Sequence, residues 1–194
     1  MVLYEDTRQQ IHAGDKHKNI HDHCKRAGID VVRAALPFGD YCLSDNLEDK
    51  EFTYTGRDED GNPVEKTVIK KVPIKGSVLV DSKKDLLEIS GNLASRDHRR
   101  IRDEMIRAQE AECQLIFLIE EIPPCGMIDL WVPPVFQSTT RYHRAGQPVT
   151  RANPVLLHKM METMTKKYGA KFIFCDRSQT GRILISILTG EYRV

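Results

Sequence analysis

The run QLIFLIEE, Gln114 to Glu121, constrains the fold of this chain more than any other segment. Its apolar residues follow one another without the polar alternation of a strand that has one face in water. Such a run is typical of a central strand covered on both faces. A second apolar run, SVLVD at 77–81, predicts another strand, and the two together favour a layered α/β protein.

Segments of strand and helix character alternate through the rest of the chain. Apolar and β-branched residues predict strands at 2–4, 30–36, 39–43 and 170–175. Helical spacing and glycine stop signals predict helices at about 15–27, within 95–111 and at 153–169. A final helix is expected within 176–192, with a strand over 182–188 as the competing assignment. This order predicts an α/β fold with a central mixed sheet flanked by helices.

The chain of 194 residues is expected to form one domain, 1–194, that contains two long segments outside the regular pattern of strands and helices. The first, 45–76, has two alternating segments around the turn sequence DEDGNP and predicts an inserted β-hairpin. Its part from Asp45 to Lys66 holds eight acids against three bases, so the hairpin is expected to be acidic. The second, 123–154, holds six prolines and little periodicity and is expected to be a long loop.

Composition excludes several classes of protein. The formal net charge is only +1, which excludes a uniformly basic coat for nucleic acid but leaves room for a local basic patch. No apolar stretch reaches the roughly 18–20 residues that span a bilayer, so no membrane partner is expected. The five cysteines form no CxxC pair, which favours a reducing compartment. We therefore expect a cytoplasmic protein, associated with the nucleoid if the source is bacterial or viral.

Three side chains at predicted strand ends form the candidate catalytic set. Asp81 and Lys83 lie two residues apart and so point to the same face of a strand. Asp40, at the start of another strand, reaches the same point if the two strands are neighbours. Two converging carboxylates suit Mg²⁺ or Mn²⁺, which activates water for attack on phosphate, and a nearby ammonium orients that water. The alternative is an ordinary strand exit, with Lys83 and Lys84 in water.

Five motifs, in order along residues 3–121, carry a resemblance to a known family. They are Asp6-Thr7-Arg8, LPFGDY at 36–41, VLVDSKKDL at 78–86, RIRDEMIRAQ at 100–109 and IFLIE at 116–120. Together they resemble the nuclease domain of the XPF/Hef structure-specific endonucleases, in the PD-(D/E)xK, restriction-endonuclease-like superfamily. The resemblance implies that fold, a DNA endonuclease dependent on Mg²⁺ or Mn²⁺, branched or flapped DNA rather than a small molecule as substrate, and formation of a homodimer.

The motifs of the family fall on particular residues of this chain. Its Asp-x-Arg-Glu motif falls on Asp6, Arg8 and Gln9, its Gly-Asp motif on Gly39 and Asp40, its Glu-Arg-Lys motif on Asp81, Ser82 and Lys83, and its Arg-Leu-x-x-Gln pattern on Arg100, Ile101 and Glu104. The chain departs from the family where Gln9 replaces a carboxylate, Ser82 an arginine and Asp81 a glutamate. The remaining acid of the family has no clear counterpart, and Asp85 and Glu88 are the nearby candidates.

The resemblance also implies a role for each matching side chain. Asp40 and Asp81 are expected to hold the metal, with Lys83 beside the attacking water. Asp6 is expected to support the site, while Arg8 and Arg100 hold phosphate.

A basic segment is the candidate contact for DNA. Between Gln137 and Lys171, seven bases stand against one acid. The stretch TTRYHRAGQPVTR within this segment, at 139–151, is expected to form a loop that suits phosphate contact and base stacking. The expected DNA-binding residues are Arg96, Arg99, Arg100, Arg141, Arg144 and Arg151. A solvated basic loop is an equally open alternative.

Two other functions stay open from the sequence. A catalytically inactive domain of the same fold, which binds DNA or scaffolds a partner, is suggested by the departures at Gln9 and Ser82. A protein-interaction module built around the 45–76 hairpin is the second alternative.

Overall fold

The structure, a computed structural model, describes residues 1–8, 18–94, 98–137, 148–150 and 152–192. Its centre is a six-stranded sheet with the order β10-β7-β6-β3-β1-β2. The strands are β1 (Val2–Asp6), β2 (Asp30–Ala34), β3 (Tyr41–Leu43), β6 (Val78–Lys83), β7 (Gln114–Ile119) and β10 (Lys171–Phe174). Because β3 is antiparallel to both neighbours and the other pairs are parallel, the sheet is mixed, which confirms the predicted fold class.

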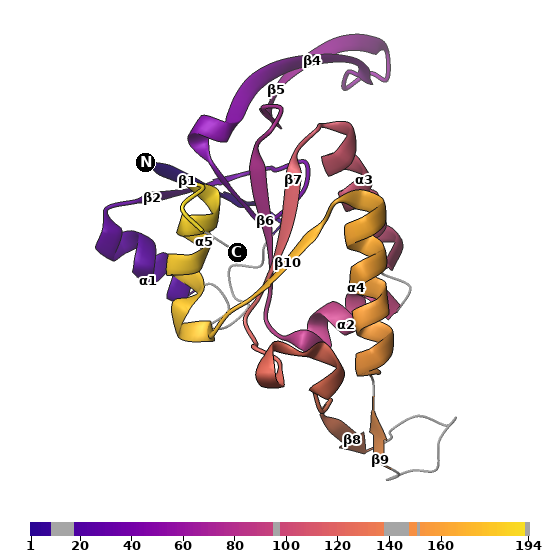
Figure 1. Cartoon of the computed structure of the whole chain (residues 1–194). Coiled ribbons are helices and arrows are strands. Elements are labelled where there is room, and N and C mark those ends of the chain that lie inside the picture. The colour runs from indigo at the N-terminus through magenta and orange to yellow at the C-terminus, as the bar shows by residue number, and fades with distance from the viewer. Residues whose placement is uncertain (9–17, 95–97, 138–147, 151, 193–194) are drawn as a thin grey trace.

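Helices cover both faces of this sheet (Figure 1). One layer holds α1 (Lys18–Ala27) and α5 (Thr180–Leu188), and the other holds α2 (Leu86–Ala94), α3 (His98–Glu110) and α4 (Pro154–Tyr168). Alternate residues of β7 enter the two layers: Phe117 packs with the α2–α4 layer, and Leu118 packs with the α1–α5 layer. The continuous apolar run at 114–121 thus forms the doubly covered strand that the sequence predicts. No helix within the described residues is both long and apolar enough to cross a bilayer.

The ends of α4 follow from local chemistry. The Asn153 side chain accepts a hydrogen bond from Leu156 N at 3.0 Å, and Pro154 occupies the first turn, where its missing N–H costs nothing. Gly169 ends the helix in the left-handed conformation, with φ of 69°, and its N–H bonds to Thr165 O.

The segment after Asp176 is a helix, α5, rather than the competing strand. Its close approach to α1 depends on Gly181: a Cβ there would lie 2.5 Å from His23 Cβ and 2.7 Å from Asn19 O. The helical spacing of Ile183, Leu184 and Ile187 then places their side chains in the α1–α5 layer.

Two regions differ from the expected pattern. The helix α2 is not predicted from the sequence, because it is short and begins almost directly after β6. The 123–154 segment is not a plain loop: it contains turns of 3-10 helix at Pro124–Gly126 and Ile128–Leu130, and the short antiparallel strands β8 (Val135–Gln137) and β9 (Pro148–Thr150).

The predicted inserted hairpin is present as a separate two-stranded sheet. The strand β4 (Leu47–Arg57) pairs with β5 (Pro63–Pro73) along their whole length, and the hairpin projects beyond the main sheet (Figure 1). At its tip, Asp58 Oδ1 accepts hydrogen bonds from Asp60 N at 3.0 Å and Asn62 N at 2.7 Å, a side-chain-stabilised turn.

Candidate active site

The strands β3 and β6 bring Asp40 and Asp81 to one place. Tyr41 pairs with Val80, and this antiparallel register puts Asp40, one residue before β3, opposite Asp81. Two hydrogen bonds hold this arrangement: Asp40 N donates to Val80 O at 2.8 Å, and Ser82 N donates to Asp40 Oδ2 at 2.9 Å. Since Tyr41 and Val80 enter the α1–α5 layer, Asp40 and Asp81 both face the α2–α4 layer.

Lys83 lies beside these two acids. Its side chain is buried, and its ammonium forms an ion pair with Asp81 Oδ1 above the ring of Phe117. Burial by itself lowers the pKa of Lys83, but the carboxylates of Asp81 and Asp40 outweigh burial, so the pKa lies above its ordinary value. Lys83 therefore carries its proton at neutral pH.

A third carboxylate, Glu104 of α3, completes a group that we call the acid–lysine cluster: Asp40, Asp81, Lys83 and Glu104. Glu104 Oε1 accepts a hydrogen bond from Gly39 N at 2.7 Å. Burial, and next the negative charge of Asp81, raise the pKa of Glu104 above its ordinary value. Glu104 matches a position of the family's Arg-Leu-x-x-Gln pattern, but the sequence alone assigns it no role in the site. It shares the inner helix face with Ile101 and Met105, and an acid on a buried helix face is a signal of function.

Asp6 and Arg8 hold the loop that leads to Asp40. The carboxylate of Asp6 is buried, where it lies 2.5 Å from Arg8 Nε and accepts a hydrogen bond from Leu36 N at 3.2 Å. Arg8 Nη2 donates to Leu36 O at 2.8 Å, and Asp6 N donates to Asp40 O at 2.8 Å. Asp6 therefore contacts the backbone around the site, and one side of Arg8 is still exposed to solvent.

Ser82, where the family has arginine, does not face the acid–lysine cluster. Its neighbours Asp81 and Lys83 point to the α2–α4 layer, so the Ser82 side chain is buried on the opposite face of the sheet. Only its backbone N–H takes part in the site, through the bond to Asp40. Replacing arginine by serine here consequently removes no side chain from the acid–lysine cluster.

The two nearby acids, Asp85 and Glu88, serve the start of α2. Asp85 Oδ1 accepts a hydrogen bond from Glu88 N at 2.7 Å, and Glu88 Oε2 accepts one from Lys84 N at 2.8 Å. Such reciprocal bonds resemble a capping box, which satisfies N–H groups that have no partner within the helix.

Only part of the expected DNA-binding set falls within the described residues. Arg99 is exposed on α3, and Arg100 Nη2 donates to Asn92 Oδ1 at 3.1 Å. The positive charge of Arg100 also acts to lower the pKa of Glu104, so Arg100 lies near the cluster. The residues Gln9, Arg96, Arg141, Arg144 and Arg151 lie outside the described residues.

The donor set of the cluster fits a hard divalent cation. Among the described residues, no three acidic, histidine or cysteine side chains, Glu104 included, are arranged so that all three could hold one metal ion. Mg²⁺, however, is commonly held by only one or two carboxylates, with water and phosphate completing its shell. Asp81 Oδ1 is buried, and no hydrogen-bond donor other than the Lys83 ammonium reaches it within the described part of the chain. Asp40 and Asp81 are the pair that would hold such an ion.

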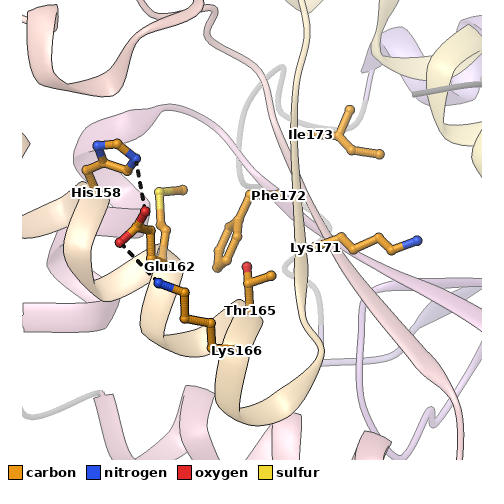
Figure 2. A pocket seen from close by; sticks show the side chains of 8 residues that line it. His158, Glu162, Thr165, Lys166, Lys171, Phe172 and Ile173 are labelled. Carbon is orange, nitrogen blue, oxygen red and sulfur yellow. Dashed lines mark ion pairs between the residues drawn. The ribbon is translucent and has the colours of Figure 1, made fainter.

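Two hollows of the surface lie near the sheet, and neither is lined by a residue of the acid–lysine cluster. A cavity of about 360 Å³ opens beyond the end of β6, between Lys84 and Asp85 on one side and Glu120, Trp131 and Arg177 on the other. A second hollow, of about 440 Å³, lies between α4 and β10 (Figure 2). The second has an apolar floor and a rim of ion pairs that joins His158, Glu162 and Lys166, and none of its lining residues belongs to the acid–lysine cluster.

No family model matches the sequence, and no curated protein matches it. Solved structures that are similar to the chain include two of XPF. XPF from Aeropyrum pernix matches with a TM-score of 0.54 and 16% identity over 96% of this chain and 64% of that chain. XPF from Aeropyrum pernix in complex with DNA matches with a TM-score of 0.50 and 16% identity over 98% and 64%.

The chain spans about 64% of the length of these XPF structures, and at 16% identity the likeness establishes the fold. The order of motifs in the sequence and the topology of the sheet agree with it. The chain therefore has the restriction-endonuclease-like fold of an XPF nuclease domain.

Proposed function

We propose that this protein is a metal-dependent DNA endonuclease that hydrolyses phosphodiester bonds. One observation carries the proposal: Asp40, Asp81 and Lys83 lie together, mostly buried, on one face at the carboxyl end of β6, within a fold of the XPF nuclease type. Isolated charges are rarely buried unless they are paired or hold an ion, so this arrangement supports a functional site.

Each residue of the cluster has a distinct task in this proposal. Asp40 and Asp81 hold Mg²⁺ or Mn²⁺, and Asp6 and Glu104 position the backbone around Asp40. A bound divalent ion would activate a water molecule for attack and neutralise charge on the phosphate. The Lys83 ammonium, which pairs with Asp81, would donate hydrogen bonds to the attacking water or to phosphate.

The substrate in this proposal is branched or flapped DNA. The resemblance of the motifs to structure-specific endonucleases supports this choice, and one of the similar structures is an XPF in complex with DNA. The exposed Arg99 and Arg100 are placed on the helix that carries Glu104, where they suit phosphate contact beside the cluster. Homodimer formation, as the resemblance implies, belongs to the same proposal.

A cleavage assay tests the proposal on labelled fork, flap and plain duplex DNA, with Mg²⁺ or with EDTA. We expect the wild type to cut branched DNA only with Mg²⁺. Asp81→Asn and Asp40→Asn keep the shape of each side chain but remove a ligand charge, so each is expected to lower cleavage by at least about a hundredfold. Binding of DNA in EDTA should persist.

A matched variant on α3 controls for surface charge. Glu110→Gln removes an exposed acid from the helix that carries Glu104, so it should cut DNA like the wild type. If the wild type binds DNA but cuts none of the substrates with either metal, the protein is the catalytically inactive DNA-binding domain instead.

A further inference from the structure

The β4–β5 hairpin presents two faces of unlike chemistry. Residues that pair directly across its antiparallel strands lie on the same face, and successive residues alternate between faces. The register therefore gathers one set that we call the Lys–aromatic face: Lys50, Phe52, Tyr54, Lys66, Val68 and Lys70. The opposite face carries Asp49, Glu51, Thr53, Thr67, Ile69 and Lys71.

The acidity of the hairpin lies away from the Lys–aromatic face. Three acids, at 58–60, occupy the turn at the tip, and Asp49, Glu51 and Glu65 fall on the opposite face. The nearest acid on the same face, Glu48, pairs with Val72 at the base of the hairpin. The three lysines of the Lys–aromatic face therefore form a local cationic surface on a segment whose overall composition is acidic.

Aromatic rings are exposed between these lysines. Phe52 is 39% exposed and Tyr54 is 50% exposed, although both are large side chains that a soluble protein normally covers. Lys70 Nζ lies 5.5 Å from the centre of the Phe52 ring. The stem of Lys66 lies across Gly56, where a Cβ would be 2.9 Å from Lys66 Cδ, and its Nζ donates to Arg57 O at 2.8 Å.

Packing does not explain this face. A two-stranded sheet is at best marginally stable in water without a covering layer, and most residues beyond the base of this hairpin are exposed. Exposed rings interleaved with lysines are the features of a surface for single-stranded nucleic acid, because the rings stack on unpaired bases while the ammonium groups contact phosphates. The charge of the face is complementary to that partner.

We propose that the Lys–aromatic face binds single-stranded DNA, as a second contact outside the acid–lysine cluster. This inference rests on the proposed function, in which branched DNA supplies an unpaired arm. The hairpin joins the main sheet before the first residue of β6, whereas the cluster lies at the last residues of β6. A hollow of about 630 Å³ is lined both by Lys70 of the hairpin and by Arg8 and Leu36, next to the loop that leads to Asp40. A strand that leaves the cluster can therefore reach the Lys–aromatic face without entering the site.

A binding experiment tests this inference without cleavage. Fluorescence anisotropy in EDTA measures the affinity for a labelled oligothymidylate and for a duplex of equal length, over a series of salt concentrations. Phe52→Ala/Tyr54→Ala should weaken single-strand binding by about tenfold or more, with a much smaller loss for the duplex, because only unpaired bases stack. Lys50→Gln/Lys70→Gln should make the plot of log binding constant against log salt concentration less steep for the single strand. The slope should change by about 1.4, or about 0.7 for each lost phosphate contact.

Variants outside the Lys–aromatic face provide the controls. Thr53→Ala/Thr67→Ala removes two exposed hydroxyl groups that bond to each other on the opposite face, and Arg57→Gln/Lys75→Gln removes two charges outside the Lys–aromatic face. Both should bind the oligonucleotide like the wild type. Equal losses in test and control variants, or equal losses for single strand and duplex, would overturn the inference.

The outcomes separate this inference from the proposed function. If the hairpin variants bind single-stranded DNA like the wild type and also cut branched DNA, the inference fails and the nuclease proposal stands. If the wild type has no salt-sensitive affinity for any DNA, both fail, and the exposed rings belong to a protein contact.

Discussion

At the residue scale, the position of Asp40 depends on Gly39. Gly39 has a φ of 69°, a conformation that side chains with a Cβ rarely adopt, and its N–H bonds to Glu104. A Cβ at Gly39 would lie 3.2 Å from Leu79 Cβ and 3.3 Å from Val80 O. A glycine at this position lets the loop turn tightly against β6, which places the carboxylate of Asp40 opposite Asp81.

Gly39→Ala is expected to lower the free energy of unfolding by about 1–3 kcal/mol, because alanine is strained at positive φ and meets β6 closely. Urea unfolding followed by circular dichroism measures this change. Gly91→Ala is the control: Gly91 lies in α2 with no atom within 4 Å of its added Cβ, so alanine there should stabilise by about 0.5–1 kcal/mol. Equal stability of Gly39→Ala and the wild type would contradict the role of Gly39.

At the scale of elements, α2 begins almost directly after β6 ends. Besides the bonds of Asp85 and Glu88, Glu121 Oε2 accepts a hydrogen bond from Leu86 N at 2.8 Å. Glu121 Oε1 accepts a second one from Trp131 Nε1 at 2.8 Å, so the end of β7 is joined to α2 and to the 123–154 segment. Trp131 is buried and serves packing here. These bonds fix the direction of the chain directly after Lys83.

Asp85→Ala should destabilise the protein by about 1 kcal/mol, because it removes the acceptor for Glu88 N at the start of α2. Asp85→Asn keeps an acceptor oxygen, so it should cost much less and should leave Mg²⁺-dependent cleavage close to that of the wild type. Thermal melting and the cleavage assay check both expectations. Loss of cleavage in a stable Asp85→Asn would show that the charge of Asp85 belongs to the site.

At the scale of the whole molecule, the two layers share one sheet and each contains buried thiols. Cys42 belongs to the α2–α4 layer, while Cys24 and Cys175 belong to the α1–α5 layer. Burial raises the pKa of Cys42 to about 12 and the pKa values of Cys24 and Cys175 to about 11. Cys125, in contrast, is exposed.

Thiol labelling tests whether 1–194 unfolds as the single domain that its length predicts. At mildly alkaline pH, Cys125 should react at once, because it is exposed, whereas the three buried thiols should stay protected by burial and by their raised pKa values. In a urea series read by mass spectrometry, Cys24, Cys42 and Cys175 should become reactive together. Labelling of one layer at a lower urea concentration than the other would show two independent units.

The spacing of apolar residues along the sequence predicts most helices and strands and their order. It predicts the covered strand at 114–121, the helix that Gly169 ends, and the hairpin at 45–76, because these depend on residues close in the chain. It does not predict α2, whose start depends on bonds to Glu121, far along the sequence. The motif match marks Glu104 but gives it no role, because its contact with Gly39 is a long-range one.

By itself, the sequence determined the alternating pattern of strands and helices, the motifs that resemble a nuclease family, and the candidates Asp40, Asp81 and Lys83. Tertiary structure alone decided that β3 lies beside β6. This pairing puts Asp40 opposite Asp81, although the whole hairpin separates them in the sequence. Tertiary structure also decided which lysines and rings share a face of the hairpin. The physical reason is that periodicity depends on neighbouring residues, whereas the pairing of strands depends on how the whole chain packs.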